Sequence, residues 1–195
     1  MIQVTCQMKI MVEKNELIVE AAARMFARYG FAKTTIGDIA TEAGVARQTV
    51  YNAFSGKDGI LRAVVRHHGQ KTYDGVISAW ADATTVAEKL TIFQEQGPIA
   101  WIEAVRAAPD WAALIDGMHK AATEEIKVLD AQWIAALDRM LEGHDVATTD
   151  DGPSLREVAE FFYTTSLNAK YGAADLEALR RRLATIRTAT LALLD

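Results

Sequence analysis

The feature that most constrains this chain is a helical spacing of apolar residues that runs through almost all of it. Apolar side chains recur at positions i, i+3, i+4 and i+7 from Leu17 to Leu194, whereas alternating apolar and polar stretches are scarce. This pattern predicts an all-α chain of about nine helices. We expect them at residues 14–29, 36–43, 47–54, 57–81, 85–96, 98–107, 110–142, 154–171 and 175–194. For helix 110–142, a break near Gly117 is the alternative.

Local signals for helix starts support these boundaries. Each proline (Pro98, Pro109 and Pro153) stands where a helix is expected to begin or break, because its fixed φ suits a first helical turn. In addition, four hydroxyl residues precede a carboxylate by three positions, which allows each side chain to cap the other's backbone amide. The pairs are Thr35 with Asp38, Ser55 with Asp58, Thr85 with Glu88, and Ser154 with Glu157.

Composition limits the class of protein further. With 195 residues, half of them apolar, the chain can bury a full core as one domain or as a small domain joined to a larger one. The single cysteine, Cys6, excludes an internal disulfide and is typical of a reducing compartment. The sequence has neither a signal peptide nor a run of about 18 apolar residues. We therefore expect a soluble, cytoplasmic protein with no membrane partner.

Charge is distributed unevenly along the chain. The net charge is -5, but residues 1–70 contain nine Lys and Arg against six Asp and Glu, and residues 71–195 contain twelve against twenty. Ionic screening over roughly 8 Å lets a local basic patch act apart from distant acidic residues. The negative net charge therefore does not exclude a nucleic-acid partner.

Residues 17–54 have the pattern of three short helices that pack together. An apolar stripe runs along the first helix, and Gly30 follows it as a helix end at which the chain can reverse. The second helix ends at Gly44, which tolerates the positive φ of a tight turn, so the third helix must begin at once. Two short helices joined in this way predict a helix-turn-helix.

The outer face of the third helix carries side chains suited to reading DNA. Arg47 can bind guanine O6 and N7, while Gln48 and Asn52 can bind adenine N6 and N7. Thr49 offers a methyl and a hydroxyl group to the groove edge, and Tyr51 offers a hydroxyl to a phosphate. The alternative is an ordinary solvated face, which the tight turn before this helix disfavours.

The sequence of residues 17–65 resembles the N-terminal domain of the TetR family of transcriptional regulators. It reads LIVEAAARMFARYGFAKTTIGDIATEAGVARQTVYNAFSGKDGILRAVV. The matching features include Ala-Ala before an apolar-Phe pair, Thr-Thr before Asp-Ile-Ala, and the Ala-Gly-Val turn. The resemblance implies a DNA-binding domain at residues 1–56 and a divergent helical effector-binding and dimerisation domain at residues 57–195, with helix 57–81 as the connector.

The resemblance also assigns roles to single residues. It implies phosphate contacts by Thr35, Tyr51 and Lys57. It places Arg47, Gln48 and Asn52 at the base-reading positions.

Two residues depart from the family's pattern. Ala46 replaces the hydroxyl residue that is usual at the start of the recognition helix, and Ala53 replaces a frequent His. The missing side-chain cap is expected to cost the helix about 1 kcal/mol. The missing His removes one phosphate donor, so both changes concern the affinity for DNA and leave the mode of binding intact.

The last two helices have apolar faces that suit pairing with a second subunit. Large side chains recur at alternating spacings of three and four in helix 175–194. The adjacent Phe161 and Phe162 point about 100° apart, so helix 154–171 must bury two faces. We therefore expect a homodimer whose interface includes Phe161, Phe162, Leu179, Leu183, Ile186 and Leu193. The alternative is that both helices pack only within their own subunit.

Large apolar residues are spread over the middle helices, where the TetR resemblance implies a small-molecule effector. Such residues can line a pocket in which a few polar groups orient the ligand. The candidates are Phe93, Trp101, Trp111, Met118, His119 and Asn168. For each of them, ordinary core packing is the alternative.

Known catalytic and metal-binding motifs are absent from the sequence. It contains no GxSxG, GxGxxG, P-loop or HExxH motif, and only Asp116-x-x-His119 matches half of a di-metal helix pattern. His67 and His68 are adjacent, so they are not expected to share one helical face. We predict no enzymatic activity, no cofactor and no bound metal.

The expected function is that of a ligand-responsive repressor. As a dimer, it binds a palindromic operator in double-stranded DNA, and a small, largely apolar effector releases it. A helical adaptor that has lost DNA binding is the alternative, which the presence of Arg47, Gln48, Tyr51 and Lys57 disfavours.

Overall fold

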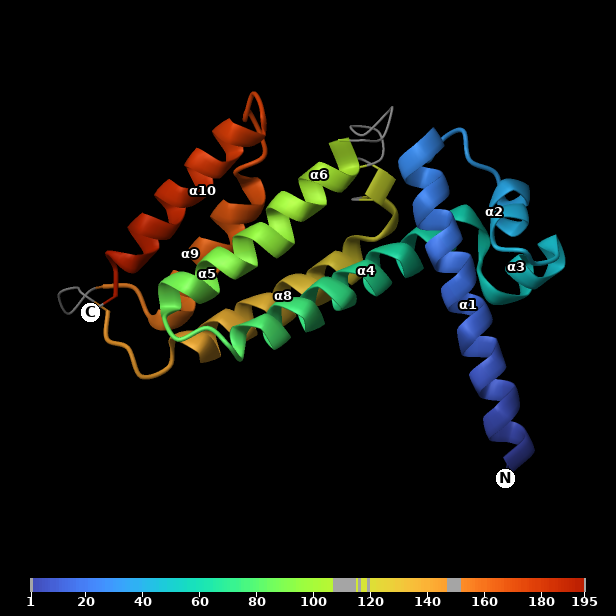
Figure 1. The fold of residues 1–195 in the computed structure, drawn as a ribbon, viewed down its shortest axis with the longest axis horizontal. Coiled ribbons are helices and arrows are strands. Elements are labelled where there is room, and N and C mark those ends of the chain that lie inside the picture. Colours follow the sequence, from blue (N-terminus) through green and yellow to red (C-terminus); the bar gives the residue numbers. More distant parts are fainter. Residues whose placement is uncertain (1, 107–114, 116, 119, 147–151, 195) are drawn as a thin grey trace. The chain divides into compact units, whose positions relative to one another are not determined.

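The computed structural model describes residues 2–106, 115, 117–118, 120–146 and 152–194, with side chains from residue 11 onward. Helices dominate it (Figure 1), and the described residues contain no strand, only one isolated β-bridge between Val146 and Leu194. The predicted all-α class is therefore confirmed. In this part of the chain, no helix combines the length and the apolar content needed to cross a bilayer.

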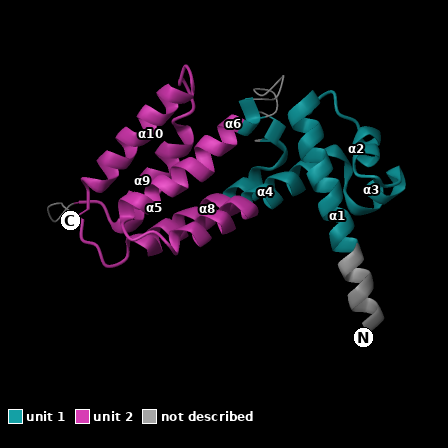
Figure 2. Cartoon of the chain, in the orientation of Figure 1, with its two compact units in different colours: residues 1–69, 104–127 teal, residues 70–103, 128–195 magenta. Residues whose placement is uncertain are grey.

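The chain divides into two compact units (Figure 2). The first contains residues 1–69 and 104–127, and the second contains residues 70–103 and 128–195. Because the division falls inside α4 (Gly56–Trp80), this helix contributes to both units. The sequence predicts a domain boundary at residue 57, close to the first residue of α4, whereas the two units divide at residue 69, inside this helix.

In the first unit, α4 follows three helices that pack through a shared apolar core. They are α1 (Ile2–Tyr29), α2 (Ile36–Glu42) and α3 (Arg47–Ala53). Most of the stripe predicted on α1 is buried, since Ile18 and Phe26 are at most 2% exposed, but Tyr29 at its end is 43% exposed. Ile39 and Val50 are buried as well. Helix α1 begins at Ile2, well before the expected residue 14.

Two glycines form the turns that the sequence predicts. Gly30 has a φ of 84° and ends α1, with its N–H donating to the Phe26 carbonyl (3.0 Å). Gly44 has a φ of 66° in the turn between α2 and α3. Only glycine adopts this backbone region without steric cost, so both turns depend on the missing side chain.

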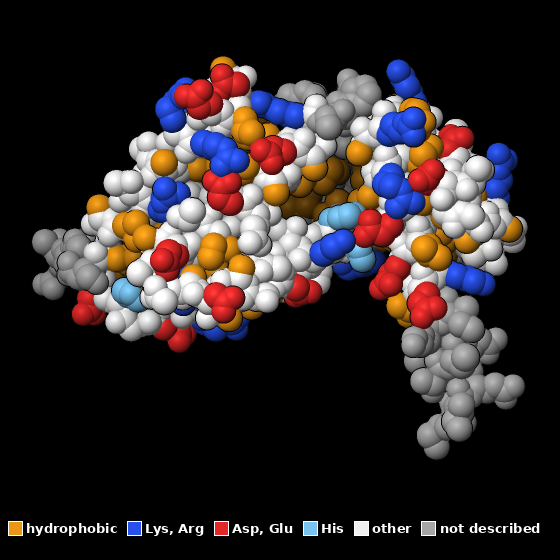
Figure 3. Space-filling view, in the orientation of Figure 1, with side chains coloured by type: hydrophobic (Ala, Val, Ile, Leu, Met, Phe, Trp, Pro, Cys, Tyr) orange, Lys and Arg blue, Asp and Glu red, His pale blue; other side chains and the backbone are white. Residues whose placement is uncertain are grey.

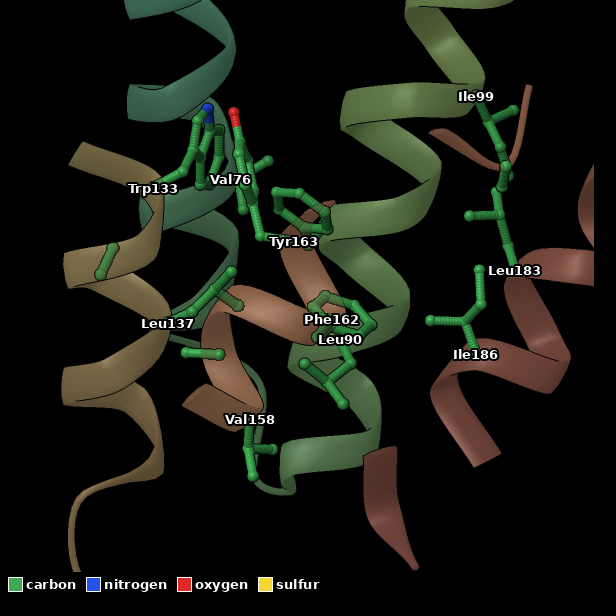
Figure 4. Packing of buried hydrophobic residues seen from close by; sticks show 14 of the residues in the cluster. Val76, Leu90, Ile99, Trp133, Leu137, Val158, Phe162, Tyr163, Leu183 and Ile186 are labelled. Carbon is green, nitrogen blue, oxygen red and sulfur yellow. The ribbon is translucent and has the colours of Figure 1, made fainter. Parts of the chain in front are cut away.

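The second unit is a helical bundle around an aromatic centre. The Phe93 ring lies 4.9 Å from the Trp133 ring and 5.4 Å from the Phe162 ring, measured between centroids. Figure 4 shows Leu183 and Ile186 extending the same cluster. Besides part of α4, this unit contains α5 (Val86–Gln94), π-helix η1 (Glu95–Ile99), α9 (Leu155–Asn168) and α10 (Leu176–Leu191). It also contains the start of α6 (Ala100–Arg106) and most of α8 (Thr123–Leu141), whose remaining residues belong to the first unit.

Pro98 does not begin a helix as expected. Helices α5, η1 and α6 follow one another without a break, and Pro98 is buried inside η1. Proline cannot donate to the helical ladder, and a wider π-turn accommodates the missing bond. Accordingly, the Ala100 N–H donates to the Glu95 carbonyl, five residues earlier.

Three of the four expected capping boxes are present. In each, the hydroxyl accepts from the carboxylate residue's N–H while the carboxylate accepts from the cap residue's N–H. These hydrogen bonds hold the pKa of each carboxyl below its ordinary value. The boxes are Thr35 with Asp38, Thr85 with Glu88, and Ser154 with Glu157. At the fourth position, the Ser55 hydroxyl accepts instead from Arg62 (3.4 Å).

Candidate nucleic-acid interface

Backbone hydrogen bonds hold the turn of the helix-turn-helix. The Val45 N–H donates to the Ala40 carbonyl (2.9 Å), and the Gly44 N–H donates to the Thr41 carbonyl (3.2 Å). Ala46 then begins α3 without a side-chain cap, as the sequence predicts. The start of α3 is therefore held by the turn that precedes it.

Helix α3 separates its apolar and polar side chains onto opposite faces. Val50 is its buried residue, and Thr49 is half-buried. The exposed side chains are those expected to meet DNA: Arg47, Gln48, Tyr51 and Asn52. More than half of Tyr51 is accessible to solvent (57%), so its aromatic ring contributes little to the core. The arrangement leaves one whole face of the helix available to a partner.

Two of these side chains are joined to each other. Gln48 Nε2 donates to Asn52 Oδ1 (2.8 Å), one helical turn away. The Gln48 carbonyl oxygen and the Asn52 amide hydrogens then remain available on the outer face. The pair thus presents acceptors and donors side by side, as recognition of an adenine edge requires.

Arg47 turns back onto α2. Its guanidinium lies against Gly37, a residue that the sequence did not identify as part of the site. It also lies near Asp38, whose pKa is lowered first by hydrogen bonds from Thr35 and further by the Arg47 charge. The glycine in Ile-Gly-Asp was the available signal, because glycine is unfavourable inside a helix.

Thr35 lies exposed at the start of α2, where a DNA phosphate is expected. Its hydroxyl donates to Asp38 Oδ2 (2.6 Å) and accepts from the Asp38 N–H (3.2 Å). A phosphate contact by Thr35 therefore requires its hydroxyl hydrogen to turn away from Asp38.

Lys57 differs from the phosphate contact that the resemblance implies. Its Nζ donates to the carbonyls of Phe31 (2.8 Å), Ala32 (3.2 Å) and Thr34 (3.1 Å), and lies 4.5 Å from the Phe31 ring centroid. An ammonium has three N–H bonds, so each one has an acceptor in the turn between α1 and α2. In this structure Lys57 holds that turn and has no N–H left for a phosphate.

His67 and His68 lie near the same residue of α1. The Nε2 atoms of these adjacent residues lie 3.0 and 3.8 Å from the two carboxylate oxygens of Glu20, and their rings are 5.3 Å apart. Both side chains thus reach one partner on α1, despite their different directions from α4. The described residues contain no group of three or more His, Cys, Asp or Glu arranged to hold a metal ion.

Most residues expected at a dimer interface are used within the subunit. Phe162, Leu179 and Leu183 are at most 1% exposed, and all three belong to the core of the second unit. Ile186 is 9% exposed and lies in the same core, pointing from α10 as Figure 4 shows. This favours packing within the subunit for these four side chains. Phe161, in contrast, is 43% exposed, and Leu193 is half-buried.

The effector candidates are dispersed. Phe93 is closed into the aromatic centre (1% exposed), whereas Trp101 is half-buried at its edge. Met118 is half-buried in the first unit, and Asn168 is exposed, with its amide donating to the Thr164 carbonyl (2.8 Å). The remaining two candidates, Trp111 and His119, lie outside the described residues.

Open grooves mark the surface of the second unit. One, of about 630 Å³, is lined by Ala79, Asp82, Ala83, Thr84, Ala87, Glu88, Thr91, Ile92 and Arg187. Another, of about 370 Å³, is lined by Thr165, Asn168, Ala169, Arg182, Thr185 and Ile186. Of the effector candidates that the structure describes, Asn168 alone lines either groove. The grooves therefore do not coincide with the aromatic residues that the sequence singles out.

A polar cluster at the edge of the aromatic centre was missed by sequence reasoning. The Tyr163 hydroxyl donates to Asp130 Oδ1 (2.6 Å), and burial together with this bond raises the pKa of Tyr163. Lys170 Nζ lies 4.3 Å from the Trp101 ring centroid, and burial lowers the pKa of Lys170 while Asp130 opposes the shift. No local signal identifies this cluster, because its residues lie far apart in the sequence.

Charged side chains of both signs are interspersed over the face shown in Figure 3. The local basic excess of residues 1–70 therefore does not form one continuous surface in this view.

Comparisons with known proteins agree with this geometry. Residues 18–64 match the family model described as bacterial regulatory proteins, tetR family. The HTH-type transcriptional regulator YerO of Bacillus subtilis is 38% identical over 56 residues, which are 29% of this chain and 19% of YerO. The chain thus spans only about a fifth of that curated relative's length, and the likeness concerns the DNA-binding part.

Solved structures extend the likeness to the whole fold. A TetR transcription regulator from Haloarcula marismortui has a TM-score of 0.70 at 20% identity, over 94% of this chain and 100% of that one. The FadR regulator of Bacillus subtilis, in complex with stearoyl-CoA, has a TM-score of 0.57 at 16% identity, over 89% and 97%. Residues 18–64 therefore match the TetR family of transcriptional regulators, and the chain as a whole shares its fold with solved TetR-family structures.

Proposed function

We propose that this chain is a repressor that binds a palindromic operator as a homodimer in the cytoplasm and is released by a small, largely apolar effector. The observation that carries the proposal is the exposed face of α3, on which Gln48 and Asn52 are hydrogen-bonded to each other beside Arg47. These polar groups contribute nothing to the core. Their role is therefore expected to lie in contact with a partner.

Base reading is assigned to four side chains of α3. Arg47 can pair with guanine, and the Gln48–Asn52 pair can recognise adenine through the groups left free on its outer side. Thr49, half-buried, contributes a methyl group at the groove edge. Since Gln48 and Asn52 orient each other, replacing either one is expected to disturb both.

Phosphate contacts are assigned to Tyr51 and Thr35. Tyr51 is exposed and carries a hydroxyl, which can fix the register of α3 without reading sequence. Lys57 is proposed to act indirectly, because its ammonium holds the turn that leads to Thr35 at the start of α2. It reaches a phosphate only if it gives up a carbonyl of that turn.

A homodimer is proposed because two copies of α3 must meet successive major grooves about 34–36 Å apart. We assign the interface to the outer sides of α9 and α10, where Phe161 is exposed. Phe161→Glu is expected to produce monomers in light scattering, whereas Phe161→Leu stays dimeric. If Phe161→Glu is also dimeric, the interface lies elsewhere.

The effector is proposed to bind at the edge of the aromatic centre, beside Trp101. This residue is half-buried, while Phe93 is already enclosed by its neighbours. Helix α4 belongs to both units, so a ligand that favours another position of this helix lowers DNA affinity by its differential affinity for the two states. Stearoyl-CoA, found on FadR of the same fold, is a suitable first probe.

Operator release is tested by titrating stearoyl-CoA with and without bound DNA. Because the coupling between two sites is reciprocal, operator DNA must weaken binding of the probe by the factor by which the probe weakens DNA binding. Equal affinities in the two titrations would show that this ligand is not an inducer.

DNA binding itself is tested by sequencing the fragments that the purified protein selects at a stated salt concentration, since affinity depends on salt. The wild-type protein is expected to enrich one palindrome, and Gln48→Ala to relax one base pair in each half-site. Lys127→Ala removes an exposed cation of α8 and serves as the control with unchanged preference. If the wild-type protein enriches no sequence, the chain is an adaptor without DNA binding.

A further inference from the structure

Gly37 occupies a position in α2 that has no backbone reason to be glycine. It lies in the helix, is buried, and is not among the glycines with positive φ. Glycine is less favourable than alanine at such a position, because it loses more conformational freedom on folding. The explanation for Gly37 therefore has to be sought in the space around it.

That space is filled by Arg47. A Cβ atom built on Gly37 would lie 2.3 Å from Arg47 Nη2, 2.6 Å from Cζ and 2.8 Å from Nε, and these are its three nearest neighbours. All three distances are shorter than real Cβ contacts allow. The guanidinium therefore lies directly on the backbone of α2, in a place that any other residue would occupy with its own side chain.

Asp38 provides a negative charge near this seat. Its carboxylate is held by the Thr35 N–H (2.9 Å) and hydroxyl (2.6 Å), and the Arg47 charge further lowers its pKa. The guanidinium thus lies on a bare stretch of backbone, near enough to a fixed negative charge to interact with it. A long side chain on an exposed helix face is otherwise free to change rotamer, and ordering it on binding has an entropic cost.

We propose that Gly37 is a positioning residue for Arg47: the side chain that Gly37 lacks leaves the seat that fixes the guanidinium on α2 before it contacts DNA. This rests on the proposed DNA-binding function. It predicts that a residue which does not itself face the groove determines affinity and sequence preference through Arg47. Gly37→Ala is expected to displace the guanidinium, because the end of a flexible side chain yields more easily than a helix backbone.

The test combines Gly37→Ala and Arg47→Ala in a double-mutant cycle on the full chain. Gly37→Ala is expected to weaken operator binding about tenfold and to relax the same base pair as Arg47→Ala. In the Arg47→Ala background, adding Gly37→Ala is expected to change nothing. The melting temperature of Gly37→Ala should equal or exceed that of the wild-type protein, since alanine favours the helix. Damage to the fold would lower it.

An NMR titration of Asp38 provides a readout that needs no DNA. Displacement of the guanidinium is expected to raise the pKa of Asp38 in Gly37→Ala. The proposal is overturned if Gly37→Ala binds the operator as well as the wild-type protein does, or if it weakens binding equally in both backgrounds. Failure of the wild-type protein to select any sequence would overturn the proposed function, and the role of this seat in DNA binding with it.

Discussion

The recognition helix α3 and the C-terminal helix α10 use their residues in opposite ways. Helix α3 has seven residues and buries Val50 alone. Helix α10 has sixteen residues and buries four of them: Leu179, Leu183, Ile186 and Thr190. The N-terminus of α10 is capped by the Asp175 side chain, whereas Ala46 offers α3 no such cap. Of these two helices, the one with an exposed polar face thus has fewer buried residues and no side-chain cap to stabilise it.

This difference teaches where each helix gets its stability. A seven-residue helix is too short to be stable alone, so α3 depends on the turn before it and on the packing of Val50. Its outer face is then unconstrained by folding. In α10 the apolar side chains hold the second unit together, and Arg182 adds hydrogen bonds to the carbonyls that follow α9. Substitutions should therefore affect function in α3 and stability in α10.

The largest effect is expected from the core side of this comparison. Leu183→Ala removes a side chain that is 1% exposed, so it should lower the free energy of unfolding by about 2–5 kcal/mol through lost burial and a cavity. Urea denaturation measures the change. Thr188→Ala, at an exposed position of the same helix, should stay within about 0.5 kcal/mol of the wild-type protein. Similar values for the two variants would contradict the assignment of Leu183 to the core.

The next effect tests whether the turn before α2 depends on Lys57. Lys57→Met keeps the aliphatic stem but removes three donors to carbonyls, so unfolding should become easier by about 1.5–3 kcal/mol. If Lys57 only holds the turn, the dependence of DNA affinity on salt should keep its slope. A slope shallower by about one would reveal a phosphate contact instead. Lys33→Met, at an exposed position of the same turn, is the matched control.

A smaller effect is expected on the binding side, at the Gln48–Asn52 pair. Either residue replaced by Ala should weaken operator binding by about 1–3 kcal/mol and leave the free energy of unfolding within about 0.5 kcal/mol. Because the two amides hydrogen-bond to each other, the double variant should lose less than the two single losses combined. Fluorescence anisotropy with labelled operator measures this, and strict additivity would mean that the residues read DNA independently.

The smallest effect concerns a cap at the start of α5. Glu88 accepts from the Thr84 and Thr85 amides, which hold its pKa below the ordinary 4.5. Its contribution to stability is therefore complete above that value and is lost as the pH falls through the lower folded pKa. The melting temperature of Glu88→Gln should lie below that of the wild-type protein at pH 7, and the difference should shrink toward pH 3. A constant difference would exclude this ionic contribution.

The features that the sequence determined are those decided within a few residues of one another. Apolar spacing predicts the helices, Gly30 and Gly44 predict the turns with positive φ, and Thr85 with Glu88 predicts a cap that the structure contains. The exposed face of α3 is also a locally determined feature, because the helical spacing places these polar residues on the side of α3 opposite the buried Val50. Backbone geometry and short-range hydrogen bonds are enough to specify such features.

Only the tertiary structure decided which groups the charged ends of long side chains contact. Lys57 reaches carbonyls more than twenty residues earlier, and Arg47 lies on Gly37 of another helix. Leu183 faces its own core where the sequence predicts an interface, since an apolar stripe does not say which surface covers it. A flexible side chain has many rotamers within reach of several partners, and packing between distant segments selects one of them.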